Sequence, residues 1–426
     1  MTNDPHESPD CCSELRRGTS RRTVLKGATA IGGGLALTQM FGESMMQASF
    51  AGAPGGNTLV VLSLRGGIDG LGVVVPHGDP GYYAARPGTA VPAGALICKD
   101  ALFGLHPKMA PLEPFWRSKE LAAVQAVGLA VPNRSHFSAI EDIEDAAPGS
   151  TTRSGWINRM VGLSGTDRPV NAVQLGNGFP TEALQGPASV LAATQLSELK
   201  IRATDAGWES ARYSSLESVW RGSQSVLARA AADTISVSKT VADPIAAASS
   251  NAAAYPTSWG AQPFVEPLKS AAQLIRADLG TDVIAIDAGI WDFHTGYGTP
   301  TYGSMQASVD GFAQALAGFL TDLGTLRSRV TVVTISEFGR RVTENGSGGF
   351  DHGWGNMMLL AGAGVKGGQY YGTWPRLDAA NLAEGDLKVT TDYRNVLGEI
   401  AARRFPGRSL STLFPGLSYN PLGFMA

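Results

Sequence analysis

The sequence predicts an α/β protein whose central sheet is mostly parallel and carries helices on both faces. The first observation is that the segments with strand character are nearly continuous apolar runs, which is typical of strands buried on both sides in a parallel sheet. The second is their order, because strands and helices alternate regularly after residue 282. With 426 residues, the chain can form one large domain, with or without a sizeable insertion.

In the first half of the chain, the clearest element is the β-prone apolar run at residues 58–64. It is expected to form a buried strand that ends at a glycine-rich loop, residues 65–70, and this loop carries Asp69. Three further elements are expected before residue 186, namely a strand at 121–127 and short helices at 137–146 and 155–163.

The middle of the chain differs in composition. Residues 186–264 are rich in alanine and serine, contain no histidine and include a long helical pattern at about 216–238, so they are expected to be a helical insertion with little chemistry. The alternation then returns, with strands expected at 282–286, 330–335 and 356–361 and helices at 304–323 and 392–404.

Residues 1–53 are predicted to be an export signal of the twin-arginine type. Arg21 and Arg22 are followed by Leu25 and Lys26 at the expected spacing, and a mildly apolar stretch rich in glycine and alanine comes next. The alternative is a chance basic pair before a helix. If the export signal is genuine, residues 54–426 are expected to be exported through the twin-arginine translocase to the periplasm, the cell surface or the medium.

Several classes of partner are disfavoured by composition. The formal net charge of −3 gives no electrostatic reason to bind nucleic acid or an anionic membrane. No run after the leader is long enough for stable insertion into a bilayer. Cys98 is the one cysteine outside the leader, so an intrachain disulfide is not expected in the exported protein.

Residues that can bind metals follow directly after the expected strands. In parallel sheets, the loops beyond the carboxyl ends of the strands carry the chemistry. Asp292, His294 and His352 supply one oxygen and two nitrogens, which suits zinc or a similar divalent ion with an open position. Asp69 and Glu337 would suit a harder ion, magnesium or calcium, at a second site.

Each of these residues also has an ordinary structural interpretation. Ser135, which lies beside His136, stands where a serine commonly caps a helix, and Asp351 could cap the segment that follows it. His294 could be a hydrogen-bonded loop histidine, and Asp69 could belong to a turn. Arg340 and Arg394 could hold an anionic substrate or form structural ion pairs.

The sequence resembles the bacterial secreted family known as domain of unknown function 1501, over nearly the whole chain after the leader. The resemblance implies a branch of the alkaline phosphatase and sulfatase superfamily, whose members hydrolyse phosphate or sulfate esters at one or two metal ions. The matching motifs besides the leader are LRGGIDG at 64–70, residues 76–86, RSHF at 134–137, GWINR at 155–159, WDFH at 291–294, SEFGR at 336–340, DHG at 351–353 and TDYR at 391–394.

The resemblance also implies roles for single residues. Asp69 would be the first-strand aspartate, and Ser135 the nucleophile at a helix N-terminus, where backbone N–H groups favour an anionic ester. Asp292 and His294 would be the metal-binding pair after a middle strand, and His352 the late histidine before the final strand.

One motif departs from the superfamily pattern. The aspartate–histidine pair usual after the strand at 330–335 is here Glu337 and Phe338, and phenylalanine cannot bind a metal. Unless His136 compensates, the second metal site lacks a ligand.

The sequence thus predicts an exported, metal-dependent hydrolase that acts on an anionic small-molecule or glycan ester of phosphate or sulfate, with Ser135 and His136 as catalytic residues. The alternative is a secreted binding or scaffold protein that keeps the fold with a degraded metal site. A serine hydrolase of carboxylic esters is disfavoured, because no Gly-x-Ser-x-Gly motif surrounds Ser135.

Overall fold

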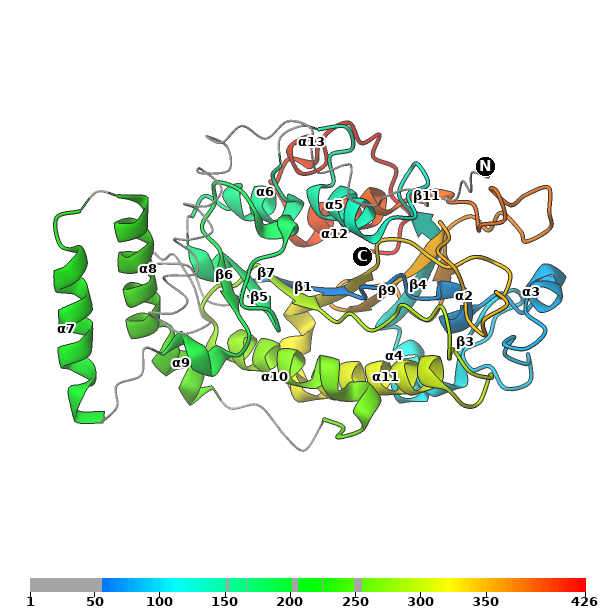
Figure 1. The fold of residues 1–426 in the computed structure, drawn as a ribbon, viewed down its shortest axis with the longest axis horizontal. Coiled ribbons are helices and arrows are strands. Elements are labelled where there is room, and N and C mark those ends of the chain that lie inside the picture. The colour runs from blue at the N-terminus through cyan, green and yellow to red at the C-terminus, as the bar shows by residue number, and fades with distance from the viewer. Residues whose placement is uncertain (1–55, 151–152, 167, 201–205, 224, 249–254) are drawn as a thin grey trace, which may run out of the picture.

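The computed structural model describes residues 56–150, 153–166, 168–200, 206–223, 225–248 and 255–426. The expected export signal at 1–53 lies outside the described residues. Figure 1 shows a central sheet with a layer of helices on each face and a helical pair at one end. No helix in the described part of the chain is both long and apolar enough to cross a membrane.

The central sheet has nine strands, eight of which follow the order β10-β4-β9-β8-β1-β7-β5-β6, while β11 pairs with β4. Strand β9 is antiparallel to β4 and β8, and all the other pairings are parallel, which confirms the predicted mostly parallel sheet. The strands are β1 (Thr58–Ser63), β4 (Leu121–Gly128), β5 (Ala172–Leu175), β6 (Leu191–Ala193), β7 (Val283–Asp287), β8 (Val330–Ile335), β9 (Asn356–Gly362), β10 (Tyr370–Tyr371) and β11 (Thr391–Asp392). A separate antiparallel pair joins β2 (Val74–Val75) to β3 (Gly104–Leu105).

Helices cover both faces of this sheet, as expected, and strand β1 shows why. Its side chains alternate, so that Leu59 and Val61 pack into one apolar core while Val60 and Leu62 pack into the other. One layer contains α5 (His136–Asp145), α6 (Trp156–Gly162), α12 (Tyr393–Arg404) and α13 (Leu410–Leu413), and the opposite layer contains α4 (Glu113–Arg117), α10 (Gln262–Ala277) and α11 (Ser304–Asp322) (Figure 1). Two short helices, α2 (Gly70–Val73) and α3 (Pro80–Ala85), follow β1.

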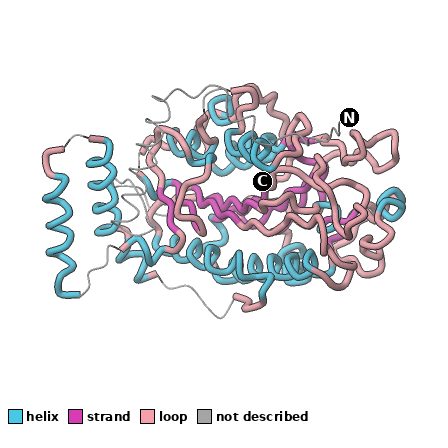
Figure 2. The backbone as a smooth tube through the Cα atoms, viewed as in Figure 1, coloured by secondary structure: helices cyan, strands magenta, loops and turns pink. Residues whose placement is uncertain are grey.

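The elements expected from the sequence form within one residue of their predicted ends, with one exception. The continuous helical pattern at 216–238 is divided between α7 (Glu209–Trp220) and α8 (Val226–Thr240), which pack together through Tyr213, Ala231 and Ile235. The break contains Gly222 at φ +83°, a conformation that glycine adopts without strain. The tube in Figure 2 shows the two helices beside the sheet, and α9 (Ala242–Ala247) follows them.

The segment at 186–264 is therefore less uniform than expected. Its first residues include β6, which extends the sheet by pairing in parallel with β5. Both strands are too short for a clear periodic signal, which explains why the sequence did not predict them.

The topology also determines where the candidate residues meet. Strands β1, β7 and β8 are parallel neighbours, so the loops that follow them lie at one edge of the sheet. Strand β9 is antiparallel, which brings the loop before it to the same edge. Strand β4 pairs with β9 in antiparallel orientation, so its carboxyl end, which leads to α5, also lies there.

Candidate metal centre

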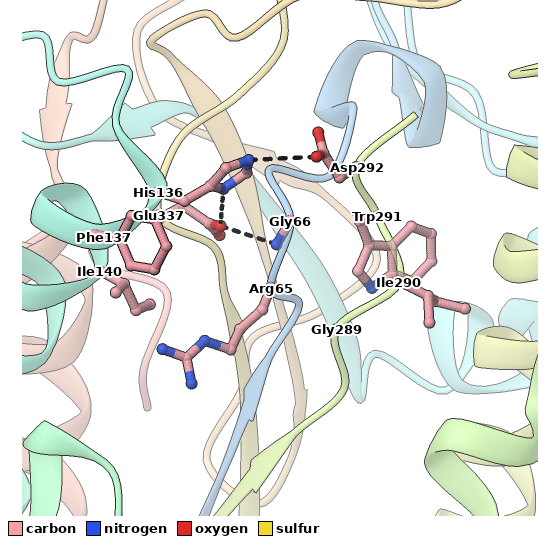
Figure 3. A pocket seen from close by; sticks show the side chains of 10 residues that line it. All are labelled: Arg65, Gly66, His136, Phe137, Ile140, Gly289, Ile290, Trp291, Asp292 and Glu337. Carbon is pink, nitrogen blue, oxygen red and sulfur yellow. Dashed lines mark hydrogen bonds and ion pairs between the residues drawn. The ribbon is translucent and has the colours of Figure 1, made fainter. Parts of the chain in front are cut away.

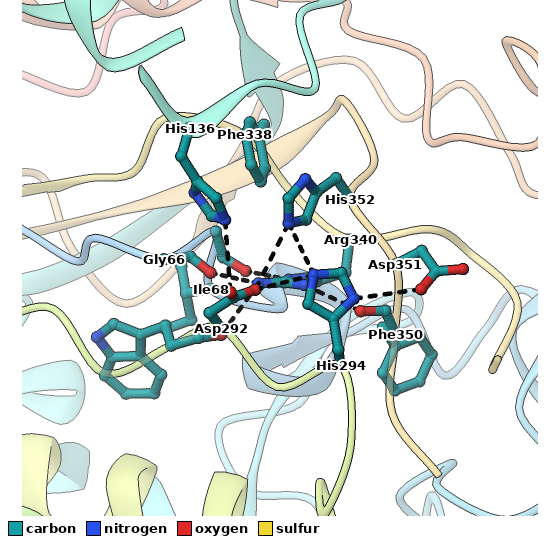
Figure 4. A network of polar contacts seen from close by, with 12 residues as sticks. Gly66, Ile68, His136, Asp292, His294, Phe338, Arg340, Phe350, Asp351 and His352 are labelled. Carbon is teal, nitrogen blue, oxygen red and sulfur yellow. Dashed lines mark hydrogen bonds and ion pairs between the residues drawn. The ribbon is translucent and has the colours of Figure 1, made fainter. Parts of the chain in front are cut away.

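Three histidines and one aspartate converge at this edge of the sheet (Figure 4). His136 is the first residue of α5, Asp292 and His294 come from the loop after β7, and His352 precedes β9. Ligand atoms of His136, Asp292 and His352 all lie within 4.8 Å of one another. The Nε2 atom of His294 lies 3.2 Å from Asp292 Oδ1 and 2.8 Å from His352 Nε2.

The hydrogen bonds of two imidazoles define which ring nitrogen is free. His352 Nδ1 lies 2.8 Å from the carbonyl oxygen of Arg134, which can only accept, so Nδ1 carries the proton. His294 Nδ1 likewise faces Asp351 Oδ1 at 3.2 Å. In neutral rings both Nε2 atoms then present lone pairs to each other, and lone pairs at 2.8 Å repel. A proton or a metal ion shared by the two Nε2 atoms would remove this repulsion.

His136 adds a third nitrogen of the same kind. Its Nδ1 lies 2.7 Å from Glu337 Oε1, while its Nε2 lies 3.6 Å from Asp292 Oδ2. That Nε2 is buried and has no hydrogen-bond partner among the described residues. One proton could bridge a single pair of nitrogens, whereas a metal ion can satisfy three nitrogens and a carboxylate together. Histidine ligands whose second nitrogen is held by a carboxylate or carbonyl are typical of metal sites.

Glu337 contacts the Nδ1 side of the His136 ring. Its Oε1 also accepts from the Gly66 amide at 2.8 Å, and its Oε2 accepts from the Ser336 hydroxyl at 2.9 Å. The carboxylate is buried. Glu337 therefore orients His136, in contrast to the expectation that it would bind a second ion.

Arg340 supplies the positive charge that holds Asp292. Its Nη2 donates to Asp292 Oδ1 at 2.6 Å, while Nε and Nη1 donate to the carbonyls of Gly67 and Phe350 at 2.6 and 2.9 Å. Burial favours the neutral carboxyl of Asp292, but the hydrogen bond and charge of Arg340 lower its pKa below the ordinary value. Asp292 is thus anionic at neutral pH, and the buried Arg340 connects three loops through its hydrogen bonds.

Phe338 stands where the resemblance noted from the sequence implied a histidine. Its ring packs against His136 and His352, with ring centroids 4.8 and 4.7 Å apart. Burial, opposed by the bond to the Arg134 carbonyl, lowers the pKa of His352 below its ordinary value. The phenylalanine therefore packs against both imidazoles, and His136 lies directly beside it.

Asp69 does not join the cluster. It is 2% exposed and accepts from Arg86 Nη1 and Nη2 at 2.6 and 2.9 Å, and from the Tyr297 hydroxyl at 2.7 Å. A carboxylate held by a bidentate arginine and a phenol has little capacity left for a cation. Asp69 and Glu337, the residues expected at a second site for magnesium or calcium, thus lie outside the group of His136, Asp292 and His352 that could hold a metal ion.

Ser135, the predicted nucleophile, is exposed at the start of α5. It holds the N-cap position, but within the described part of the chain its hydroxyl caps no backbone N–H. Its own amide donates to Asn133 Oδ1 at 3.1 Å. The Ser135 hydroxyl therefore does not cap the helix.

A cleft of about 570 Å³ opens beside the cluster (Figure 3). It lies between α5 and the loop after β7, and His136, Glu337 and Asp292 line one part of it. The residues lining it are Arg65, Gly66, His136, Phe137, Ile140, Gly289, Ile290, Trp291, Asp292 and Glu337.

Sequence reasoning missed the groups that orient the ligands. The carbonyl of Arg134 carries no signal in the sequence, because any residue offers one. Asp351, interpreted as a possible cap, instead contacts His294, and Asn345 Nδ2 donates to the same Asp351 oxygen at 3.0 Å. A carboxylate directly before a candidate ligand, as in Asp351-His352, was the available clue.

Residues 116–406, more than half of the chain, match the family described as Protein of unknown function (DUF1501). None of the curated proteins matches the sequence. Three solved structures are similar in part. The C-terminal periplasmic domain of EcEptC from Escherichia coli, in complex with Zn, is 9% identical, with 75% of this chain and 76% of that chain covered and a TM-score of 0.29.

The lipoteichoic acid synthase LtaP from Listeria monocytogenes is 10% identical, with 84% and 80% of the two chains covered and a TM-score of 0.33. The PsFucS1 sulfatase from Pseudoalteromonas sp. is 11% identical, with 81% and 68% covered and a TM-score of 0.33. At this level of similarity, the chemistry of the site has to be inferred from the chain's own side chains.

Proposed function

The chain belongs to the DUF1501 family of proteins of unknown function, and we propose that it is an exported, metal-dependent hydrolase of phosphate or sulfate esters. The observation that carries the proposal is the orientation of His136, His294 and His352. Each turns one ring nitrogen to a hydrogen-bond acceptor and the other toward Asp292.

Three imidazoles and a carboxylate form a donor set that suits zinc. A divalent ion held there would act as a Lewis acid, stabilising the negative charge that develops on the ester oxygens. The protein's own groups would keep this arrangement rigid. Glu337 and the Arg134 carbonyl fix the rings of His136 and His352, while Arg340 keeps Asp292 ionised.

The alternative, a binding or scaffold protein with a degraded site, was suggested by Phe338. Two contacts favour the hydrolase instead. The phenylalanine ring packs on His136, and His136 presents a buried, unpartnered Nε2 to Asp292. An open cleft beside the cluster gives an ester room to approach.

Measurements of metal binding test the role proposed for the three histidines. We expect one zinc per chain in metal-loaded wild-type protein, and we expect His352→Ala to weaken zinc binding by about 100-fold or more, because one of the nitrogens is lost. Competition with a zinc chelator measures the affinity. His77→Ala is the matched control, since His77 bonds the Asp100 carbonyl outside the cluster. Equal zinc affinity of the His352→Ala variant and the wild type would contradict the proposal.

Turnover separates enzyme from scaffold. Zinc-loaded wild-type protein should hydrolyse aryl phosphate or aryl sulfate esters. If Ser135 is the nucleophile, Ser135→Ala should abolish this activity while zinc content and thermal stability stay the same. Retained turnover in Ser135→Ala would assign the attack to water. No turnover by the wild type on either ester class, with zinc bound, would favour the scaffold.

A further inference from the structure

We propose that the cleft beside the histidine cluster binds the uncharged, apolar part of the ester, with Phe137 as its main contact. The substrate class is then an aryl or alkyl ester of phosphate or sulfate rather than a sugar ester. This inference rests on the proposed function, because it takes the cluster as the place where the anionic group binds.

Phe137 is the most exposed apolar residue of the cleft. It directly follows His136 in the first turn of α5, and its side chain is 84% exposed. Single exposed apolar residues are common on protein surfaces. Phe137 differs because Ile140, one helical turn later, lines the same wall, so the two side chains form a continuous apolar surface beside His136 (Figure 3).

The opposite wall presents little side-chain surface, because Trp291 is 1% exposed and packs into the apolar core. It is formed by Gly289, Ile290 and Trp291, which come from the loop after β7 and precede Asp292 (Figure 3). The indole N–H of Trp291 donates to the carbonyl of Ala288 at 3.1 Å, so this polar group already has a partner. A sugar would need hydrogen bonds from the side chains of these two walls, and those side chains are mostly hydrocarbon.

The charges along the cleft point the anionic group toward the cluster. Arg65 is the one lysine or arginine among the residues that line it. Its guanidinium lies 2.7 Å from an oxygen of Asp287 and 3.8 Å from one of Glu144. The guanidinium is therefore already paired with Asp287, which leaves less attraction for another anion. The cluster end is the place for the charged group, and the body of the ester lies between the walls.

Binding of phosphonates tests this inference without turnover, because their P–C bond is not an ester. The probes are methylphosphonate, phenylphosphonate and a hexosyl phosphonate, titrated calorimetrically into the zinc-loaded full chain. We expect phenylphosphonate to bind about tenfold more tightly than the other two, because its ring buries apolar surface against Phe137. Phe137→Ala should remove most of that preference and leave the affinity for methylphosphonate unchanged. Because the ring of Phe137 is exposed, the substitution should not disturb folding. Circular dichroism and zinc content check this.

The matched control is Phe179→Ala, since Phe179 is 55% exposed and does not line the cleft. Equal affinities for methylphosphonate and phenylphosphonate, or an unchanged preference in Phe137→Ala, would overturn the inference while leaving the proposed function intact. Tighter binding of the hexosyl phosphonate would also overturn it. If no phosphonate binds to zinc-loaded protein, the inference and the proposed function fail together.

Discussion

Asp69 and Asp292 both follow a strand at the same edge of the sheet, yet their carboxylates have different partners. Asp69 is buried against Arg86, whereas the side chain of Asp292 is 48% exposed and faces three histidines. The sequence offered both residues as candidates for metal binding, Asp292 at the zinc site and Asp69 at a second site for magnesium or calcium. Arg86 lies 17 residues beyond Asp69, and nothing local marks it as the partner.

Replacement of Asp69 tests its structural role. Asp69→Asn leaves the buried guanidinium of Arg86 without a counter-charge, so we expect a loss of about 3–5 kcal/mol in the free energy of unfolding. Zinc stoichiometry should stay the same in the folded protein. Urea denaturation and metal analysis measure the two effects. Asp292→Asn is the comparison, because it should lose zinc affinity instead; loss of zinc in folded Asp69→Asn would restore the ligand role.

Glu144 gives a pH dependence that is independent of the metal ligands. Burial raises the pKa of its carboxyl to about 7 from a model-compound value of 4.5, although Arg65 opposes the shift. The folded state thus holds this proton more strongly than the unfolded state does. The contribution to stability is fully present below pH 4.5, falls as the pH rises, and is lost above pH 7.

Glu144→Gln should therefore be more stable than the wild type at pH 8, by up to about 3 kcal/mol, because the neutral amide avoids the cost of a buried charge. At pH 4 the difference should vanish. Urea denaturation at the two pH values measures it, with Glu141→Gln on the same helix as the control. A difference between Glu144→Gln and the wild type that does not change with pH would contradict the expectation.

At the scale of elements, the loop between β1 and α2 packs against Phe338, which in turn packs against His136 and His352. Gly67 has φ +63°, and a Cβ atom there would lie 2.5 Å from Phe338 Cε2. The Phe338 ring is buried and packs on His136 and His352, so it has little room to move. This turn must therefore be glycine for two separate reasons, its backbone conformation and the close approach of the phenylalanine.

Gly67→Ala should lower the free energy of unfolding by about 2–4 kcal/mol and weaken zinc binding, because Phe338 is pushed into the imidazoles. Gly296→Ala is a matched control. Gly296 has the same φ of +63°, but a Cβ atom there meets no atom within 4 Å. Gly296→Ala should therefore lower the free energy of unfolding only through backbone strain, by about 1 kcal/mol. Thermal denaturation and chelator competition compare the variants; equal losses in both would show that the collision is unimportant.

At the scale of the whole molecule, the antiparallel strand β9 completes the site. A fully parallel sheet would place the residues before β9 at the opposite edge. Because β9 runs against β4 and β8, its amino end meets the carboxyl ends of its neighbours, and His352 reaches Asp292. The apolar pattern of residues 356–361 predicts a buried strand in either direction, so its orientation was not available from the sequence.

The predicted export concerns the whole chain, and the arginine pair should control it. Arg21→Lys with Arg22→Lys should leave folded precursor in the cytoplasm, because the twin-arginine translocase recognises the pair. Fractionation followed by immunoblotting measures the distribution. The same change at Arg16 and Arg17, a second pair that lacks the expected leucine and lysine spacing, is the control. Normal export of the Arg21/Arg22 variant would indicate the general secretory route.

The sequence by itself predicted the strands at 58–64, 121–127 and 330–335 and most of the helices to within one residue, because apolar periodicity is a local property of the chain. It also brought forward His136, Asp292, His294 and His352 as ligand-type side chains near the ends of strands.

Only the tertiary structure decided what each carboxylate does. Asp69 pairs with Arg86, Glu337 orients His136, and Asp292 faces the cluster, although all three are acidic residues that follow strands. The physical reason is that a carboxylate's role depends on the nearest cation or N–H group. Those partners are brought in by strand pairing and loop packing from segments distant in sequence, and periodicity contains no information about them.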